Sequence, residues 1–258
     1  MFKYFDVHSH LNLSQFDLDR EDQINKLQDL EIGTIVVGTN KTKSEYAVEL
    51  AGKNLNIWAT IGQHPTDIDE EFDFNFFEKL AQNPRVVGVG ECGLDYYREG
   101  FDKERQKEIF IQQIELALKY DKALMIHSRP SKGSMNAYEE VLDILENYKE
   151  RGVRANFHFF VGDVEIAKRA LGLGFTMSFD GPITFSRDYD EVIKFIPLES
   201  ILAETDAPFA APIPYRGQRC EPYHVIEIVK KIAEIKGEDL EKVRDQLVKN
   251  SFRVFGIK

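Results

Sequence analysis

Short apolar segments alternate with longer amphipathic segments along the whole chain, and this alternation limits the possible folds more than any other feature. Eight such apolar segments are present, at residues 4–8, 34–38, 57–61, 86–90, 123–127, 155–159, 175–179 and 201–205. Their apolar residues are largely continuous instead of alternating with polar ones. Continuous runs of this length are typical of parallel strands that are covered on both faces.

The segments between these predicted strands have apolar residues at helical spacing. In 102–120, for example, Ile109, Phe110, Ile114 and Ala117 recur at the spacing of one helix face. We predict further helices at 21–30, 43–53, 74–82, 137–148, 164–171, 188–195, 224–235 and 239–250. Strands that alternate with helices in this way indicate a parallel α/β fold.

The number of predicted strands favours closure into a barrel over an open sheet. No G-x-G-x-x-G motif follows the first strand, which removes the main reason to expect a dinucleotide-binding fold. The length of 258 residues is close to the roughly 250 typical of a (β/α)₈ barrel, and no linker or repeat divides the chain. We therefore predict a single (β/α)₈ TIM barrel domain over residues 1–258, with its active site at the C-terminal ends of the strands.

Composition excludes several classes of protein. No apolar stretch approaches the roughly 18 residues of a membrane span, and residues 1–6 lack the apolar core of a secretory signal, so we expect a cytoplasmic protein without membrane association. The net charge of −11 argues against broad binding along duplex DNA, although bound cations can reverse the field inside one cleft. Cys92 and Cys220 are far apart, so we expect two buried or partly buried free thiols.

Histidines and isolated acids gather at the ends of the predicted strands. Seven such side chains lie at or just after a strand end: His8, His10, His64, Glu91, His127, His158 and Asp206. In a barrel these strand ends converge on one face, where active sites are built. A mixed set of imidazoles and carboxylates suits Zn²⁺, Mn²⁺ or a similar ion better than Ca²⁺. The pattern therefore predicts a metal-dependent hydrolase.

Individual positions in this set support metal binding. His8 and His10 are two residues apart on a strand, so both imidazoles can reach one metal. Burial of the Glu91 carboxylate is costly unless it is paired or metal-bound, and its two oxygens can bridge two cations about 3.5–4 Å apart. Asp206 can bind a metal and accept a proton from an attacking water. We expect Glu204 to form a hydrogen bond to a ligand and not to bind the metal itself.

Five motifs occur in a fixed order over nearly the whole chain. They lie at 6–11 (DVHSHL), 62–65 (GQHP), 90–95 (GECGLD), 126–129 (IHSR) and 204–208 (ETDAP), with PYRG at 214–217 just after the last. Together they resemble the TatD family of metal-dependent deoxyribonucleases, within the amidohydrolase-like barrel group. The resemblance implies two divalent metal ions, of Mg, Mn or Zn, the first held by His8, His10, Glu91 and Asp206 and the second by Glu91, His127 and His158.

The resemblance also implies hydrolysis of phosphodiester bonds, typically in DNA and from the 3′ end. DNA is then the expected substrate, and no stable protein partner is predicted. Asp206 would be the general base and Glu91 the bridge between the metals. Arg129 and Arg216 are candidate phosphate clamps, with surface arginine as the alternative. His64 is expected to contact substrate or to support a ligand, in preference to direct ligation.

Two positions depart from the family pattern. The family usually has a small polar residue after the histidine of the sixth strand, where this chain has Val161, and an asparagine where this chain has Cys220. We expect these departures to affect substrate preference more than metal binding. Tyr96, Tyr97 and Phe160 are candidate stacking platforms for unpaired bases, although packing in the core is at least an equal possibility.

Two other classes of function are compatible with the sequence. The first is a hydrolase of a small-molecule ester, lactone or amide, as in other barrels of the group. Many of those enzymes bridge their metals with a carboxylated lysine on the fourth strand, where this chain has Glu91. The second is a nucleic-acid or protein-binding factor that catalyses nothing. That function would not explain why six polar side chains, whose burial costs free energy, occur together.

Overall fold

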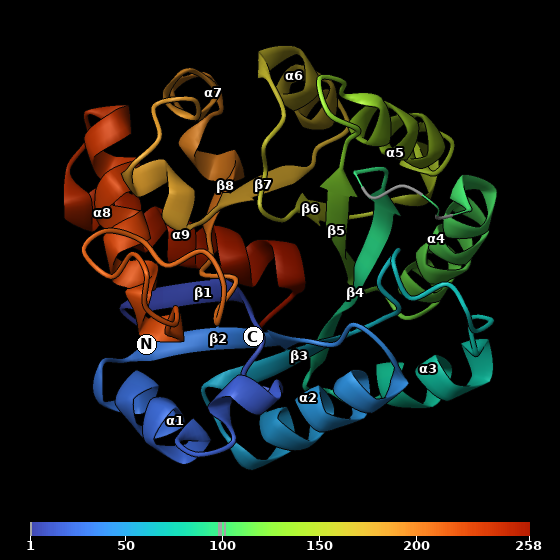
Figure 1. Ribbon diagram of the computed structural model, residues 1–258, viewed down its shortest axis with the longest axis horizontal. Helices are drawn as coiled ribbons and strands as arrows, with labels where there is room; N and C mark the ends of the chain where they lie inside the picture. The colour runs from blue at the N-terminus through green and yellow to red at the C-terminus, as the bar shows by residue number, and fades with distance from the viewer. Residues whose placement is uncertain (1, 98–99, 101) are drawn as a thin grey trace.

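The computed structural model describes residues 2–97, 100 and 102–258. Within them, eight strands form one sheet in the order of the chain, and every neighbouring pair is parallel. The strands are β1 (Tyr4–Ser9), β2 (Ile32–Val37), β3 (Ile57–Ile61), β4 (Val86–Asp95), β5 (Ala123–Arg129), β6 (Ala155–Phe157), β7 (Thr176–Phe179) and β8 (Ile201–Ala203). This arrangement confirms the predicted (β/α)₈ barrel (Figure 1).

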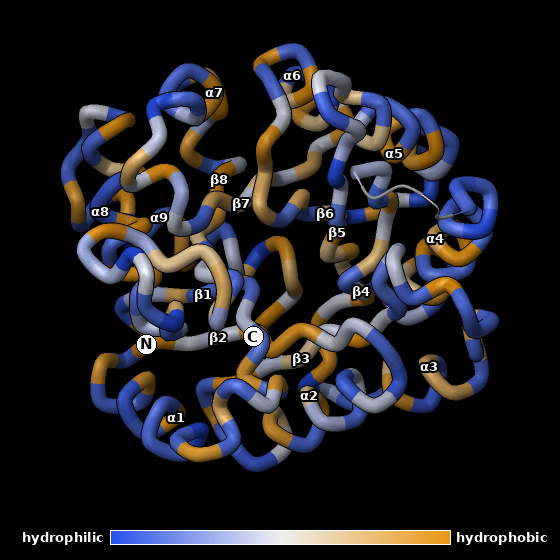
Figure 2. The backbone as a smooth tube through the Cα atoms, in the orientation of Figure 1, coloured by the Kyte–Doolittle hydropathy of each residue, from blue (hydrophilic) through white to orange (hydrophobic). Residues whose placement is uncertain are grey.

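Helices surround the sheet (Figure 1). They are α1 (Arg20–Asp29), α2 (Lys41–Lys53), α3 (Phe74–Ala81), α4 (Lys103–Lys119), α5 (Asn136–Glu146), α6 (Val164–Gly172), α7 (Asp190–Phe195), α8 (Val225–Lys236) and α9 (Leu240–Phe255). Short 3₁₀ helices occur at η1 (Ser14–Phe16), η2 (Lys149–Arg151), η3 (Gly181–Thr184), η4 (Leu198–Ser200) and η5 (Pro222–His224). Hydrophobic and hydrophilic residues alternate along the outer helices, as expected of amphipathic helices with one buried face (Figure 2).

The barrel is closed where β1 meets the segment that follows β8. The backbone N–H of His10 donates to the carbonyl of Ala207 over 2.7 Å, and the N–H of Asp206 donates to the carbonyl of His8 over 2.9 Å. An isolated parallel bridge joins Ser9 to Ala207 at the same place. The seam therefore brings two of the predicted metal-binding histidines next to the predicted general base.

Two groups of buried side chains form the core. Alternate residues of the strands, such as Val7 and Ile35, cluster with the C-terminal end of α9, where Val254 and Phe255 are buried. The other residues of the strands pack against the surrounding helices in a second, larger cluster. This division follows from the two-residue period of a strand, which sends successive side chains to opposite faces.

The ends of β4, β6 and β8 differ from the prediction in ways that shape the site. β4 continues to Asp95 instead of ending at residue 90, and its register against β5 shifts between Val89 and Cys92. Gly90 and Gly93 have φ of +146° and +134°, and a Cβ on Gly93 would lie 2.1 Å from the carbonyl oxygen of His127. The extension therefore depends on glycine, and it carries both Glu91 and Asp95 into the sheet.

β6 is shorter than predicted, because the chain turns immediately after it. Phe159 has φ of +45°, which interrupts the extended backbone, so His158 follows the strand instead of lying within it. β8 likewise ends at Ala203, before Glu204. None of the helices formed by the described residues combines the length and the apolar character needed to cross a membrane.

Candidate metal centre

Glu91 lies at the centre of the polar side chains that the barrel brings together. One carboxylate oxygen, Oε1, is 2.8 Å from Nδ1 of His127 and 2.8 Å from Nε2 of His158. The other oxygen, Oε2, is 3.6 Å from Nε2 of His8 and 3.8 Å from Nε2 of His10. The two oxygens of one carboxylate therefore face two different pairs of histidines.

Asp206 completes the group on the side of β1. Its Oδ1 lies 3.2 Å from Nε2 of His10 and 3.5 Å from Nε2 of His8. The backbone of Asp206 has φ of +51°, a conformation that aspartate tolerates better than most residues. Its N–H donates to His8 and its carbonyl accepts from the N–H of Phe209 over 2.8 Å. This geometry holds the carboxylate beside His8 of β1 and His10, which follows the strand.

These donors fit a divalent cation. His8, His10 and Glu91 offer three ligand atoms within 4.8 Å of one another, and so do His64, Glu91 and His127. Nε2 of His8 and Nε2 of His10 are only 3.1 Å apart, so their lone pairs converge on the same space. Such a set of buried nitrogen and oxygen ligands suits Zn²⁺, Mn²⁺ or a similar ion. The residues present can therefore hold a metal.

Charge in the centre is organised around Glu91. Burial by itself would raise the pKa of this carboxyl, but the positively charged imidazoles around it, led by His158, hold the pKa well below its ordinary value. Burial would lower the pKa of His158, yet the charge of Glu91 keeps it well above its ordinary value. By contrast, burial and the charge of His158 hold the pKa of His8 well below its ordinary value.

Two further carboxylates lie near His127 and His158, on the side of each imidazole that faces away from Glu91. Oδ2 of Asp95 lies 3.2 Å from Nε2 of His127, the nitrogen that points away from Glu91. Oε1 of Glu204 lies 3.5 Å from Nδ1 of His158, and Oε2 of Glu204 accepts a hydrogen bond from Ser178 over 2.6 Å. A carboxylate behind a metal-binding imidazole fixes the ring orientation and raises its basicity.

The supporting role of Glu204 remains a prediction, because its carboxylate also forms a group of possible ligand atoms with His8 and His158. The sequence reasoning missed Asp95. Asp95 is part of the 90–95 motif, and an isolated acid at the end of a glycine-rich apolar run was the available signal. The sequence does not predict its contact with His127, because that contact depends on the extension of β4. The extension places Asp95 opposite Arg129 in the register and next to His127. Only the irregular register of β4 makes that contact possible.

Asp95→Asn should weaken metal binding by about 10- to 100-fold, as changes to such supporting carboxylates typically do. The reason is that asparagine keeps the shape but not the negative charge behind His127. The measurement is hydrolytic activity during titration of metal-stripped protein with Mn²⁺. Asp29→Asn, an equal change of charge at the exposed end of α1, should titrate like the wild type. An unchanged metal titration for Asp95→Asn would contradict the supporting role.

His64 lies in the centre itself. Its Nε2 is 3.3 Å from Oε1 of Glu91 and 3.3 Å from Nδ1 of His127, while its Nδ1 bonds with the hydroxyl of Thr66 over 2.7 Å. This position is as close to Glu91 as that of several predicted ligands. The expected role of His64 in substrate contact remains a prediction, and its geometry equally permits ligation.

Arg129 and Arg216 lie outside the cluster of ligands, and both are exposed. The guanidinium of Arg129 is 4.0 Å from the centre of the Tyr97 ring, and that of Arg216 is 3.9 Å from the centre of the Phe185 ring. Among the residues that the structure describes, neither arginine forms an ion pair with a carboxylate. Each guanidinium therefore lies on an aromatic face.

The remaining candidates separate into buried and exposed residues. Tyr96 and Phe160 are buried, and the Tyr96 hydroxyl donates to Glu140 over 2.7 Å, whereas Tyr97 is 53% exposed, with the Arg129 guanidinium over one face of its ring. Cys92 and Cys220 are free and buried, as predicted. Val161, by contrast, is 37% exposed. Of the two departures from the family pattern, only Val161 therefore lies where a bound molecule can touch it.

Comparison with known proteins supports the resemblance in the motifs. Residues 5–256 match the family described as TatD related DNase. An uncharacterized metal-dependent hydrolase of Bacillus subtilis is 36% identical, over 98% of this chain and 99% of its own length. A protein of Shigella flexneri named a 3′-5′ ssDNA/RNA exonuclease is 30% identical, over 98% of this chain and 99% of its own.

Solved structures agree with this assignment. The crystal structure of a TatD homologue from Escherichia coli K12 superposes with a TM-score of 0.91 at 25% identity, and the match covers 99% of each chain. The arrangement of the strands is therefore shared over nearly the full length. With its match to the family over nearly every residue, this chain belongs to the TatD family of metal-dependent hydrolases.

Proposed function

We propose that this protein is a two-metal exonuclease that removes nucleotides from the 3′ end of single-stranded DNA. The observation that carries the proposal is the orientation of Glu91, whose two oxygens face separate pairs of histidines. In this proposal His8, His10, Glu91 and Asp206 hold one ion, and Glu91, His127 and His158 hold the other. A carboxylate between two cations is the arrangement expected of a two-metal phosphodiesterase.

In this proposal the metal ions, Asp206 and the supporting carboxylates have different roles. When bound, divalent cations in such a site polarise a phosphoryl oxygen and lower the pKa of a coordinated water. Asp206 accepts the proton of the attacking water, because its carboxylate is at the edge of the cluster and held by the backbone of β1. Asp95 and Glu204 keep the imidazoles of His127 and His158 in orientation.

Three observations favour a nucleic acid over a small-molecule ester. The Shigella flexneri relative is named as an exonuclease on single-stranded DNA and RNA. Arg129 and Arg216 supply exposed guanidinium groups, which bind phosphate oxygens well. The adjacent exposed rings of Tyr97 and Phe185 can stack on unpaired bases, which duplex DNA does not offer.

The test uses single-stranded DNA labelled at its 5′ end. Metal-stripped protein is refilled in turn with Mg²⁺, Mn²⁺ and Zn²⁺, and the products are separated by length. We expect a metal-dependent ladder that shortens from the 3′ end, with slower degradation of a blunt duplex of the same sequence. Absence of cleavage with any ion, in protein that binds two metals, would contradict the proposal and favour a small-molecule ester or amide.

A further inference from the structure

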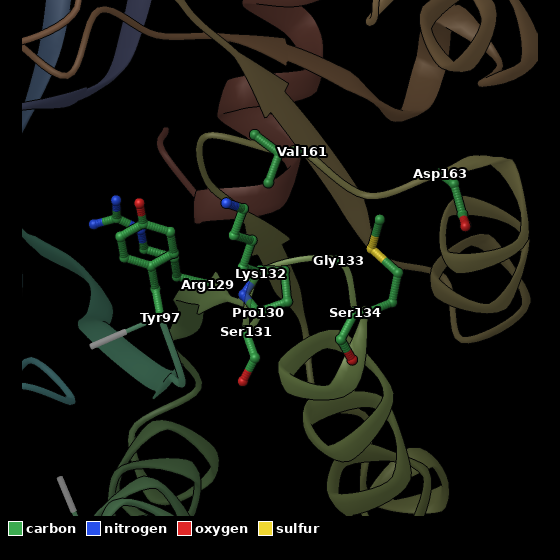
Figure 3. Close-up of a pocket in the computed structure, with 10 residues that line it drawn as sticks. Tyr97, Arg129, Pro130, Ser131, Lys132, Gly133, Ser134, Val161 and Asp163 are labelled. Carbon is green, nitrogen blue, oxygen red and sulfur yellow. The ribbon is translucent and has the colours of Figure 1, made fainter. Parts of the chain in front are cut away.

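A pocket of about 530 Å³ lies beside the metal centre, at the C-terminal ends of β4, β5 and β6. We call it the rim pocket, and its walls include Tyr97, Arg129, Ser131, Lys132, Val161 and Asp163 (Figure 3). Its volume is within the roughly 300–1,000 Å³ range typical of small-molecule sites. We propose, on the basis of the proposed function, that the rim pocket binds one nucleotide of the single strand, next to the bond that is hydrolysed.

Asp95 connects a residue of the metal centre to a residue that lines the rim pocket. Oδ2 of Asp95 faces Nε2 of His127, and its Oδ1 accepts a hydrogen bond from the backbone N–H of Tyr97 over 3.0 Å. Arg129 follows His127 by two residues on β5. A nucleotide in this pocket would therefore have its neighbouring phosphate close to the cluster of histidines.

The charge of the rim pocket suits a phosphate. Arg129 and Lys132 are exposed, and among the described residues Lys132, like Arg129, has no carboxylate partner. Asp163 is the acid among the lining residues named above, and its Oδ1 is engaged by the N–H of Ile166 at the start of α6 over 2.9 Å. In Figure 3, Asp163 lies across the pocket from Arg129. Two exposed cations therefore line the pocket beside one acid, in a chain whose net charge is −11.

The apolar walls of the rim pocket suit a base. The Tyr97 ring is 53% exposed and Val161 is 37% exposed, so a flat base has an aromatic face on one side and an aliphatic surface on another. Aromatic stacking accepts every base, because each base has a π-face. Val161 would therefore make an apolar contact with the base. The small polar residue that the family usually has at this position would offer a hydrogen bond instead.

The segment that carries Lys132 is held in shape by its own hydrogen bonds. Ser131 accepts from the N–H of Ser134 over 3.0 Å, and its side chain donates to the carbonyl of Tyr96 over 3.1 Å. The side chain of Asn136 bonds to both the N–H and the hydroxyl of Ser131, each over 3.1 Å. Gly133 has φ of +75°, which permits the tight turn. These hydrogen bonds therefore fix the backbone on both sides of Lys132 without a bound substrate.

The experiment measures kcat and KM for a short single-stranded oligonucleotide with Lys132→Ala and Tyr97→Ala. We expect KM to rise about tenfold or more in each variant, with kcat within about threefold of wild type, because the lost contacts are made equally in ground and transition states. In Lys132→Ala the slope of log KM against log salt should fall by about 0.7, the loss of one phosphate contact to a single strand. Lys132→Arg and Tyr97→Phe should restore binding.

Lys149→Ala is the matched control, since Lys149 is exposed on η2, outside the rim pocket. A wild-type KM in both test variants, or a fall in kcat without a change in KM, would overturn the rim pocket as a nucleotide site. Anisotropy of a fluorescein-labelled oligonucleotide with each variant in an Asp206→Asn background separates binding from cleavage. If the wild type cleaves no oligonucleotide but binding still depends on Lys132 and Tyr97, the proposed function fails and the pocket stands.

Discussion

Replacing Glu91 with glutamine is expected to lower the rate of hydrolysis by at least about 10³-fold, which corresponds to roughly 4 kcal/mol of transition-state stabilisation. The reason is geometric, since each oxygen of Glu91 faces a different pair of histidines. Glutamine keeps the volume of the side chain but offers one oxygen and no charge. It therefore cannot serve two cations at once.

The measurement is kcat on labelled single-stranded DNA, together with the metal content of the purified variant. We expect metal content to fall below that of the wild type, while circular dichroism and the thermal midpoint show a folded barrel. Glu150→Gln, the same change at an exposed position on η2, should leave both rate and metal content unaltered. Turnover near the wild-type rate in Glu91→Gln would refute the bridging role.

Asp206→Asn is expected to lower kcat by about 10²- to 10⁴-fold, the range that general acid–base groups contribute. Asparagine retains an oxygen that can approach His8 and His10, but it cannot take a proton from water. Its backbone should remain in place, because asparagine tolerates the positive φ of this position and the N–H still donates to His8.

Metal content distinguishes the two roles assigned to Asp206. A variant that keeps its full complement of metal and loses activity supports the role of proton acceptor. A variant that loses metal in proportion to activity supports ligation alone and removes the assignment as base. Asp29→Asn is the control for the change of charge. Full activity in Asp206→Asn would contradict both roles.

Much of the fold was readable because it depends on local patterns. Each of the eight predicted strands is present. A parallel strand that is covered on both faces is largely apolar, so about five consecutive apolar residues indicate it in the sequence. The grouping of His8, His127 and Asp206 could be predicted from the sequence for a related reason. Parallel strands in a barrel end at one face, so polar residues at strand ends must meet there.

What the sequence alone determined, then, is the barrel and the set of residues that gather at its C-terminal face. The contact of Asp95 with His127 was decided by tertiary structure, because it requires a register shift in β4 that local periodicity does not encode. The same holds for Tyr96 and Tyr97, of which one is buried and the other exposed. Strand pairing and loop packing set these details, because they depend on distances between segments that are remote in the chain.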